Sequence, residues 1–264
     1  MLRENNLGKY FTYAIGEIIL VVIGILIALQ INTANQNRQR AKLETVLLKQ
    51  VKNEMLDIYE DIWRDAARLK MGDKSHYNIS RYIGQNAAYS DSLCFDFYWL
   101  KMDEYIYPTN AAYSRIKKEG LDIVKNDTIR YYLQAIYEGV FPRLMKNNSF
   151  TPDISNFFRD YYLNSFKPNT DLSIKFKHKL ANDTIGTRVY SNEEFKFPKV
   201  NNRNGNQHTV GYVPLNFDEL KNDNKFHMLL EESKQFRNYK LSRYATGKLV
   251  IKEVVNLIDA ELKK

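Results

Sequence analysis

The chain has 264 residues, of which 44% are hydrophobic and 27% charged, and this composition excludes a collagen-like, low-complexity or wholly disordered protein. Its formal net charge is +8, and its single cysteine, Cys94, excludes a disulfide framework and any metal site built from several cysteines. The formal charges of residues 1–31 sum to zero, so the positive excess belongs to the region that follows them.

Residues 11–31 form an apolar run long enough to cross a membrane. They read FTYAIGEIILVVIGILIALQI and carry one charge, Glu17. At about 1.5 Å per residue, a helix of this length spans about 31 Å, which matches a hydrocarbon core of about 30 Å. A cleaved signal peptide would need a shorter apolar run followed by small residues before the cut, and this pattern is missing. We therefore expect a short tail at 1–10 and a retained transmembrane helix at 11–31.

One face of the expected span carries its carboxylate and two small residues. At about 100° per residue, Gly24 and Ala28 lie about 20° to either side of Glu17, and their spacing lets two helix backbones approach closely. We predict that these three residues form an association face for a second copy of the chain or for another membrane protein. Two alternatives for Glu17 stay open: a side chain that reaches headgroups and water, or an ion or proton pathway, which a single carboxylate disfavours.

Residues 32–72 predict a long amphipathic helix directly after the span. Apolar residues recur along it every three or four positions, and Gly72 followed by Asp73 is expected to end it. A coiled-coil stalk is the alternative. However, additional apolar residues such as Tyr59 and Trp63 widen the stripe beyond a coiled-coil seam, so a bundle helix is preferred.

The middle of the chain predicts several short helices with defined ends. One of them is expected to begin at Thr109 or Asn110 and another at Asn126, because threonine and asparagine cap helix N-termini well. Gly120 and Gly139 are expected to end these helices, because a glycine just past a helix readily adopts the left-handed conformation. A further helix, rich in Phe and Tyr, is expected after Pro152.

From Lys167 to about Pro214 the chain changes character and predicts a small extended or β insertion. Lys175, Lys177 and Lys179 alternate there with apolar residues, which is the period of an edge strand. Either these lysines protect a strand edge against aggregation or they form an anion-facing strand, and both interpretations stay open.

The chain ends in a helical apolar stripe from Phe226 to Leu262, in which Gly247 is the expected break. We expect this segment to pack antiparallel against the helix at 32–72, with the middle helices completing a bundle. The predicted fold is therefore mainly α: an N-terminal transmembrane helix, a juxtamembrane helix, and a helical-bundle domain at 73–264 that packs with it and carries the insertion.

The sequence contains no pattern that predicts catalysis or a bound cofactor. Its four histidines lack metal-ligand spacing, and the GxSxG, GxxxxGK[ST] and GxGxxG motifs are missing. Cys94 lies among apolar residues, which favours a buried side chain over a nucleophile. The adjacent carboxylates Asp103 and Glu104 are interpreted as solvated surface. We expect no enzyme activity, metal or cofactor, and interspersed acidic residues argue against nucleic acid as a partner.

The string GKYFTYAIGEIILVVIGILIALQIN, Gly8 to Asn32, resembles the signature of a bacterial family of single-span membrane proteins, abundant in Bacteroidota and described as a domain of unknown function. Residues 109–138 and 215–244 also agree with that family. Members often carry an Asn-Trp pair where this chain has Asn32 and Thr33, and many have a longer basic N-terminus. The resemblance implies an inner-membrane protein with a cytoplasmic N-terminus and a periplasmic domain. It supplies no reaction, ligand or catalytic residue.

Two classes of function remain. The preferred prediction is a membrane-anchored, non-enzymatic interaction or scaffold protein that self-associates, with the lipid bilayer and a second membrane protein as its partners. The alternative is a periplasmic ligand-sensing or accessory module that signals through a partner in the membrane, because residues 1–10 offer no room for an output domain. Lys and Arg are nearly balanced on the two sides of the span, so charge alone leaves the orientation open.

Overall fold

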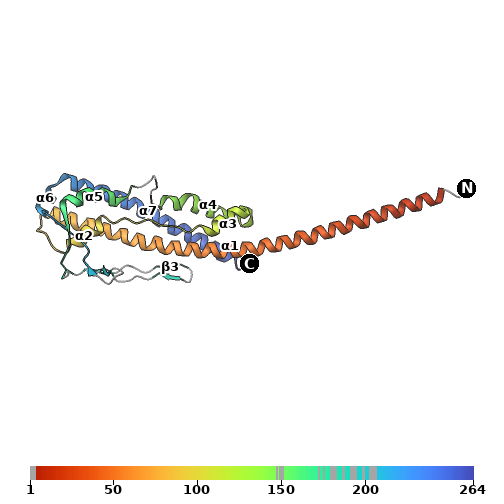
Figure 1. Ribbon diagram of the computed structural model, residues 1–264, viewed down its shortest axis with the longest axis horizontal. Coiled ribbons are helices and arrows are strands. Elements are labelled where there is room, and N and C mark those ends of the chain that lie inside the picture. The colour runs from red at the N-terminus through yellow and green to blue at the C-terminus, as the bar shows by residue number, and fades with distance from the viewer. Residues whose placement is uncertain are drawn as a thin grey trace.

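The computed structural model shows a mainly α protein with a small β insertion, as predicted (Figure 1). A long N-terminal helix projects from an elongated helical bundle, and the C-terminus lies close to the point where this helix enters the bundle. The structure describes all residues except 1–3, 147, 149–151, 172, 175, 179–182, 186–187, 191–194, 198–199 and 202–206, and it describes no side chain in 4–9, 175–184 or 189–208.

Helix α1 (Glu4–Gly84) is one uninterrupted helix of 81 residues, about 120 Å long at about 1.5 Å per residue. The helix end predicted at Gly72 is therefore wrong. A Cβ atom at this position would lie 2.4 Å from Nε of Arg237, so the glycine allows a side chain of another helix to pack directly on the α1 backbone. Gly72 thus serves a close approach between helices rather than a helix end.

Five shorter helices form the rest of the bundle together with α1 and the C-terminal helix. Asn126 caps α4 as predicted, because its side chain accepts hydrogen bonds from the backbone N–H groups of Thr128 and Ile129. Asn110 precedes α3 as predicted, but its side chain makes no capping hydrogen bond. The short helices are α2 (Leu93–Leu100), α3 (Ala111–Glu119), α4 (Asp127–Gln134), α5 (Ile154–Ser165) and α6 (Phe217–Asn222), with single turns η1 (Leu121–Ile123), η2 (Ala135–Val140) and η3 (Phe141–Arg143).

The two glycines predicted to end middle helices behave differently. Gly120 ends α3 with a φ of +96°, as predicted. Gly139 instead lies inside η2, a π-helical turn that leads directly into η3, so that prediction is wrong. Ile136 and Phe141, on either side of Gly139, are both buried, and their packing keeps the backbone helical through the glycine.

Helix α7 (Asn224–Glu261) packs antiparallel along α1, as predicted (Figure 1). Lys52 pairs with Asp259 near the end of the bundle closer to the N-terminus, and His76 lies 3.4 Å from Glu231 at the other end. The predicted break at Gly247 is wrong, because α7 passes through it without interruption. A Cβ atom there would lie only 3.3 Å from Leu144 and 3.4 Å from Ile62, so this glycine also serves close packing.

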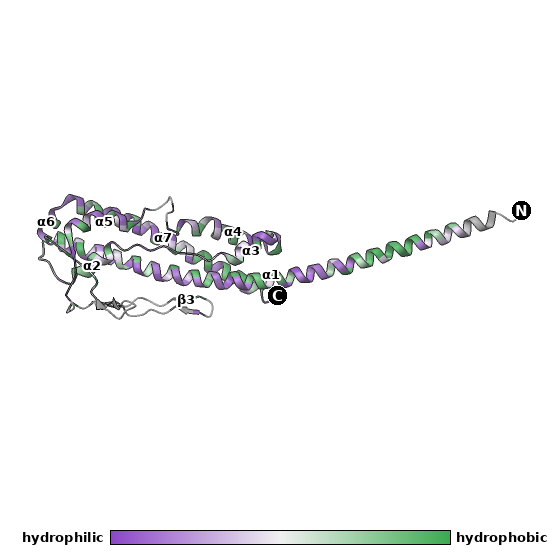
Figure 2. Cartoon of the chain, viewed as in Figure 1, coloured by the Kyte–Doolittle hydropathy of each residue, from purple (hydrophilic) through white to green (hydrophobic). Residues whose placement is uncertain are grey.

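The bundle has two large apolar clusters that follow each other along α1 and α7. The proximal cluster, nearer the projecting part of α1, combines the two long helices with α3 and α4, and includes Leu47, Ile62 and Val254. The distal cluster combines α2, α5 and α6 with the start of α7, and includes Phe97, Phe158 and Phe226. The projecting half of α1 is the most continuously apolar part of the chain (Figure 2).

The insertion between α5 and α6 consists of antiparallel two-stranded ladders. Its base pairs Phe166 with Pro214, and its far part returns along α1, where Arg188 lies 2.8 Å from Asp57 and Ile185 joins the proximal cluster. The ladders are β1 (Phe166–Pro168) with β8 (Tyr212–Pro214), β2 (Phe176–His178) with β5 (Phe195–Phe197), β3 (Asp183–Ile185) with β4 (Arg188–Tyr190), and β6 (Val200–Asn201) with β7 (Gln207–His208).

Candidate functional site

The part of α1 that precedes the bundle is exposed on every side. All residues from 10 to 40 are exposed, and among the described residues α1 is the one helix long and apolar enough to cross a membrane. Glu17, Gly24 and Ala28 lie on this stretch, and nothing lies within 4 Å of a Cβ atom built at Gly24. The predicted association face is therefore open to lipid or to a second helix.

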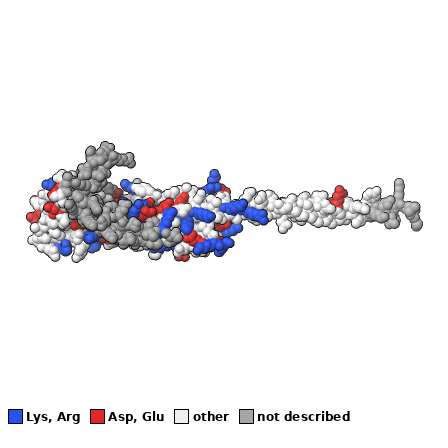
Figure 3. Space-filling view, turned by 90° about the horizontal axis from the view of Figure 1, so that it is seen from below, with Lys and Arg blue, Asp and Glu red and all other residues white. Residues whose placement is uncertain are grey.

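A polar neck, residues 32–40, separates the apolar run from the bundle. At about 1.5 Å per residue it is about 14 Å long, which is enough to pass through a headgroup layer. Lys and Arg gather where the neck enters the bundle (Figure 3), and they include Arg38, Arg40 and Lys42. Arg40 lies 2.9 Å from Asp122 of η1, so one of these charges also ties the neck to the bundle. This end of the domain is suited to face anionic headgroups.

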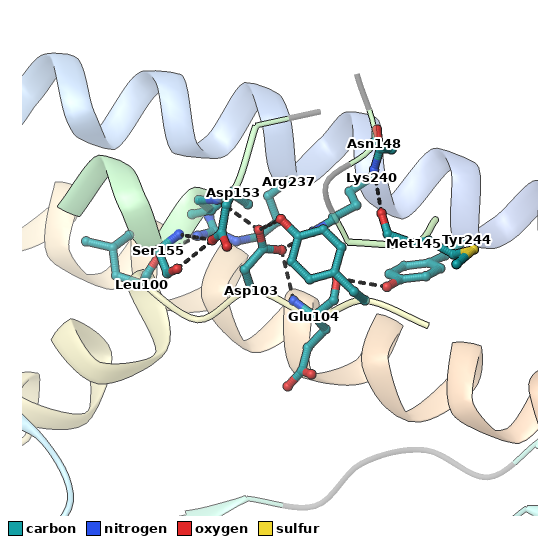
Figure 4. A network of polar contacts seen from close by, with 12 residues as sticks. Leu100, Asp103, Glu104, Met145, Asn148, Asp153, Ser155, Arg237, Lys240 and Tyr244 are labelled. Atoms are coloured by element: carbon teal, nitrogen blue, oxygen red, sulfur yellow. Dashed lines mark hydrogen bonds and ion pairs between the residues drawn. The ribbon is translucent and has the colours of Figure 1, made fainter. Parts of the chain in front are cut away.

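A layer of polar side chains separates the proximal from the distal cluster, and several of them are drawn in Figure 4. Arg237 and Lys240, both on α7, are 0% and 1% exposed, although Arg and Lys are rarely buried completely without partners. We call this layer the polar belt; it consists of Asp65, Arg68, Asp73, His76, Asp103, Glu104, Ser233, Arg237 and Lys240.

Asp103 is the centre of the polar belt, between α1 and α7 (Figure 4). Its carboxylate accepts hydrogen bonds from the Glu104 N–H at 2.9 Å, the Tyr105 hydroxyl at 2.8 Å and the Ile154 N–H at 2.8 Å. It also forms an ion pair with Lys240, whose Nζ lies 3.5 Å from the centre of the Tyr105 ring. Four donors converge on one carboxylate, so a charge buried here is well compensated.

The prediction that Asp103 and Glu104 lie on the solvated surface is wrong. The two neighbours do point apart, but Asp103 points into the bundle, where its side chain is 3% exposed. Glu104 turns toward α1 and lies 3.2 Å from Arg68. The extended segment between α2 and α3 therefore supplies the acidic side of a buried ion-pair network, which adjacent sequence positions alone do not indicate.

Arg237 is less completely satisfied than Lys240. Its Nη2 donates to the Leu100 carbonyl at 2.6 Å, and its Nη1 lies 3.8 Å from Asp73, but Nε and Nη1 make no hydrogen bond within the described residues. Burial lowers the pKa of Arg237 and raises the pKa of Asp73, and each charge opposes the other's shift. A buried charge of this kind fixes how two helices pack rather than adding net stability.

Asp65 is an acid of the belt whose pKa is strongly raised. Burial raises its pKa to about 7, the charge of Glu104 adds to the shift, and Arg68, 3.8 Å away, opposes it. Burial also raises the pKa of Glu104 and lowers the pKa of Lys240. The belt therefore contains groups whose charge states depend on one another at neutral pH.

A pocket of about 660 Å³ opens at the distal end of the bundle, far from the projecting part of α1. Its walls come from α5, from the residue that follows α2, and from strands β1 and β8. Lys101, Arg159 and Tyr212 are among the lining residues, and they are far apart in the sequence. Sequence patterns did not reveal this pocket, because no local motif links these segments.

The remaining predicted residues are placed as follows. Cys94 is fully buried, as predicted, and burial raises the pKa of its thiol to about 12. Lys175 and Lys179 lie outside the described residues, and so does the side chain of Lys177, so the anion-facing strand stays a prediction. Within the described ranges, no group of three or more His, Cys, Asp or Glu side chains is arranged to hold a metal ion.

Comparisons with protein-family models, with curated proteins and with solved structures found no match to this chain. The resemblance carried by Gly8 to Asn32 therefore stays a prediction. The apolar helix, the polar belt and the distal pocket are the features from which a function can be argued.

Proposed function

We propose that this chain is a single-pass membrane protein whose helical domain acts as a non-enzymatic interaction module at the membrane. The observation that supports this most strongly is the continuity of α1, which supplies the apolar run, the neck and one side of both apolar clusters. Because the helix is unbroken, a tilt or rotation of the span is carried into the bundle unless helical hydrogen bonds break. Such a rigid connection suits a scaffold that presents a partner at a fixed height and direction.

Self-association through the face of Glu17, Gly24 and Ala28 is part of this proposal. Small residues allow two backbones to approach, and a carboxylate within a span is stabilised when it faces protein rather than lipid. Two copies joined at this face would hold their bundles side by side above one membrane surface.

The test is disulfide cross-linking in membranes. Asn35→Cys places a reporter thiol on the same face as Glu17, because 18 residues complete about five helical turns. Gly24→Leu should abolish the cross-linked dimer while membrane insertion is retained. Gly16→Leu is the matched control, since it adds the same bulk about 100° away from Glu17 and should leave the yield unchanged. An unchanged yield with Gly24→Leu would show that this face does not mediate association.

For the localisation, we propose the bacterial inner membrane with the N-terminus in the cytoplasm and the domain in the periplasm. The resemblance over Gly8 to Asn32 is the support for this orientation. Protease treatment of intact spheroplasts tests it, because a periplasmic domain should be digested without lysis. If the domain is protected until lysis, the orientation is the opposite one, and the basic end of the domain, with Arg38, Arg40 and Lys42, faces the cytoplasmic leaflet.

A second candidate function is a ligand-sensing or accessory module that signals through a partner in the membrane. The observation that favours it is the distal pocket, which lies at one end of a bundle whose other end continues into the apolar helix. In that case the continuous α1 would transmit a change at the pocket to the membrane.

A further inference from the structure

The distal pocket combines a size suited to small molecules with walls from several elements. Its volume of about 660 Å³ lies within the range of ligand sites, about 300–1,000 Å³. Helix α5 forms one wall, strands β1 and β8 form another, and Lys101, which follows α2, reaches in from a third direction. A molecule bound here would touch both the bundle and the base of the insertion.

Aromatic rings form the apolar part of the pocket and hold one another in place. The rings of Tyr162 and Phe166 stack with centres 4.2 Å apart, and Tyr212 meets Tyr162 edge-on at 5.2 Å. Tyr162 is fixed further because its hydroxyl donates to the Phe97 carbonyl at 2.7 Å. Tyr162 and Phe166 are only 5% and 7% exposed, so they hold the partly exposed ring of Tyr212 in place rather than forming the whole surface. The pocket therefore offers a preformed apolar surface with little ordering cost on binding.

The charged part of the pocket is purely cationic. Lys101 and Arg159 both line it, and no lining residue is acidic. The ammonium of Lys101 lies 4.3 Å from the centre of the Tyr212 ring and 5.5 Å from that of Tyr162. Within the described residues, neither cation forms an ion pair with a carboxylate. A ligand anion would thus meet two positive charges that no carboxylate of the described residues pairs with.

The aromatic rings alone could also attract a cation, as aromatic cages do. Lys101 excludes this, because its ammonium already lies over the rings and would repel a second positive charge. Asn156, which also lines the pocket, adds an amide that can donate to the ligand, whereas the hydroxyl of Ser155 already donates to Asp153. The two cations and the amide of Asn156 therefore favour a negatively charged ligand over a neutral or cationic one.

We propose that the distal pocket binds a small organic anion with a flat apolar body. Its carboxylate or phosphate lies between Lys101 and Arg159, and its body packs against Tyr212 and Leu163. A ligand at this position would contact both α5 and the base of the insertion, which β1 and β8 form. The inference concerns the end of the bundle away from the membrane and does not depend on association through the span.

The test uses the full chain in phosphatidylcholine nanodiscs, with empty nanodiscs as the blank. The probes are 2-naphthoate and 1-naphthyl phosphate, which share a flat body and differ in the anionic group. Isothermal titration should give saturable binding of at least one of them. Acetate lacks the body and 2-naphthylmethanol lacks the charge, so both should bind at least tenfold more weakly. Failure of both anionic probes to saturate in the millimolar range would overturn the proposal, and so would equal binding of the neutral analogue.

Variants locate the binding. Lys101→Gln and Arg159→Gln should each weaken the better probe by roughly ten- to a hundredfold, the range for a charge-assisted hydrogen bond. Lys118→Gln and Arg115→Gln, at exposed positions on α3, remove the same charges elsewhere and should have no effect.

Lys101→Arg keeps the positive charge and should bind the probe about as well as the natural chain. An unchanged circular dichroism spectrum shows that each variant is folded. Equal loss of binding in the α3 controls would assign the effect to overall charge and overturn the proposed site. Gly24→Leu should leave probe binding unchanged, so failure of the span proposal and failure of the pocket proposal can be told apart.

Discussion

The two halves of α1 lie in different surroundings, and they satisfy opposite requirements. From residue 10 to 40 every side of the helix is exposed, and the apolar residues of 11–31 continue around its whole circumference. From Leu43 onward the apolar residues form a stripe that packs against α3, α4 and α7. In the first half the apolar side chains have no packing partner within the described residues, whereas in the second half several charged side chains pair with other helices, as Lys52 does with Asp259 of α7.

The glutamates of α1 show the difference most directly. In the bundle half, Glu44 accepts from the Lys125 N–H at 2.7 Å, and Glu54 accepts from the Ala112 N–H at 3.0 Å and the Tyr137 hydroxyl at 3.1 Å. Glu54 thereby satisfies the exposed N-terminus of α3, where a negative charge is favourable. Glu17 lies on the exposed stretch before the bundle and has no hydrogen bond or ion pair within the described residues. If it is to be satisfied by protein, that protein must be a second chain.

The largest expected effect on stability comes from removing the central acid of the bundle half. Asp103→Ala leaves Lys240 buried without its counter-ion and should lower the free energy of unfolding by about 3–5 kcal/mol. Urea unfolding of the full chain in micelles measures this, with fluorescence of Trp63 and Trp99 as the signal, since both tryptophans are buried in the bundle.

The control for Asp103 is an acid that forms an exposed ion pair. Asp122→Ala breaks the pair with Arg40, in which both side chains are at least half exposed, and should cost less than about 1 kcal/mol. Adding Lys240→Met to Asp103→Ala should recover part of the loss, because the unpaired charge is then gone. Equal effects of Asp103→Ala and Asp122→Ala would mean that the polar belt is not a special feature of the bundle.

The next effect depends on pH. The pKa of Asp65 is raised from 3.8 to about 7 in the folded state, so ionisation opposes folding, and the penalty grows as the pH rises from about 4 to about 7. Asp65→Asn should therefore be more stable than the natural chain at pH 8, by about 4 kcal/mol at about 1.36 kcal/mol per pKa unit, and equally stable below pH 4. Glu104, Arg68 and Lys240 face Asp65 and are unchanged in the variant.

Unfolding curves at pH 4, 6 and 8 measure the Asp65 effect. The quantity to compare is the difference between the variant and the natural chain, since the other belt carboxylates titrate in both. Asp61→Asn, one turn earlier on α1, breaks an exposed pair with Arg64 and is the comparison variant; it should change the free energy of unfolding by less than about 1 kcal/mol. A constant difference for Asp65→Asn would show that Asp65 ionises as freely in the bundle as in the unfolded chain.

Features set by neighbouring residues could be predicted from the sequence. The apolar run, the cap at Asn126 and the end of α3 at Gly120 depend on residues within a few positions, and the structure confirms the cap and the helix end. The stripes on α1 and α7 likewise indicated an antiparallel pair, because helical periodicity reports which face is buried.

Features set by distant partners could not be predicted in this way. Gly72 and Gly247 were expected to break helices, yet each permits close packing, and only the opposing Arg237 or Leu144 decides between these roles. Asp103 is separated by 137 positions from Lys240, so its burial leaves no local signal. The distal pocket is equally non-local, since Lys101, Arg159 and Tyr212 meet only through the fold.

A smaller effect tests whether the glycine in α7 is there for packing. Gly247→Leu forces a large side chain against Leu144 and Ile62 and should destabilise the bundle by about 1–3 kcal/mol. Gly139→Leu is the matched control, since a Cβ atom at Gly139 has nothing within 4 Å. The same urea titration measures both variants. If Gly247→Leu and Gly139→Leu change the free energy of unfolding equally, the glycine at 247 is not required for the close packing of α7 against Leu144 and Ile62.

The smallest effect concerns the end of the bundle that faces the span, where Asn126 has two roles. Its Oδ1 caps α4 and its Nδ2 donates to Glu261 at 2.8 Å, which ties the start of α4 to the end of α7. Asn126→Ala should cost about 1 kcal/mol through the lost cap. Asn126→Ser keeps a capping oxygen and loses the bond to Glu261, whereas Asn126→Asp caps well but places two carboxylates together. Capping alone predicts that Asn126→Ser and Asn126→Asp are both more stable than Asn126→Ala. If only Asn126→Ser is more stable, the repulsion between the introduced carboxylate and Glu261 shows that the contact with α7 also contributes to stability at this position.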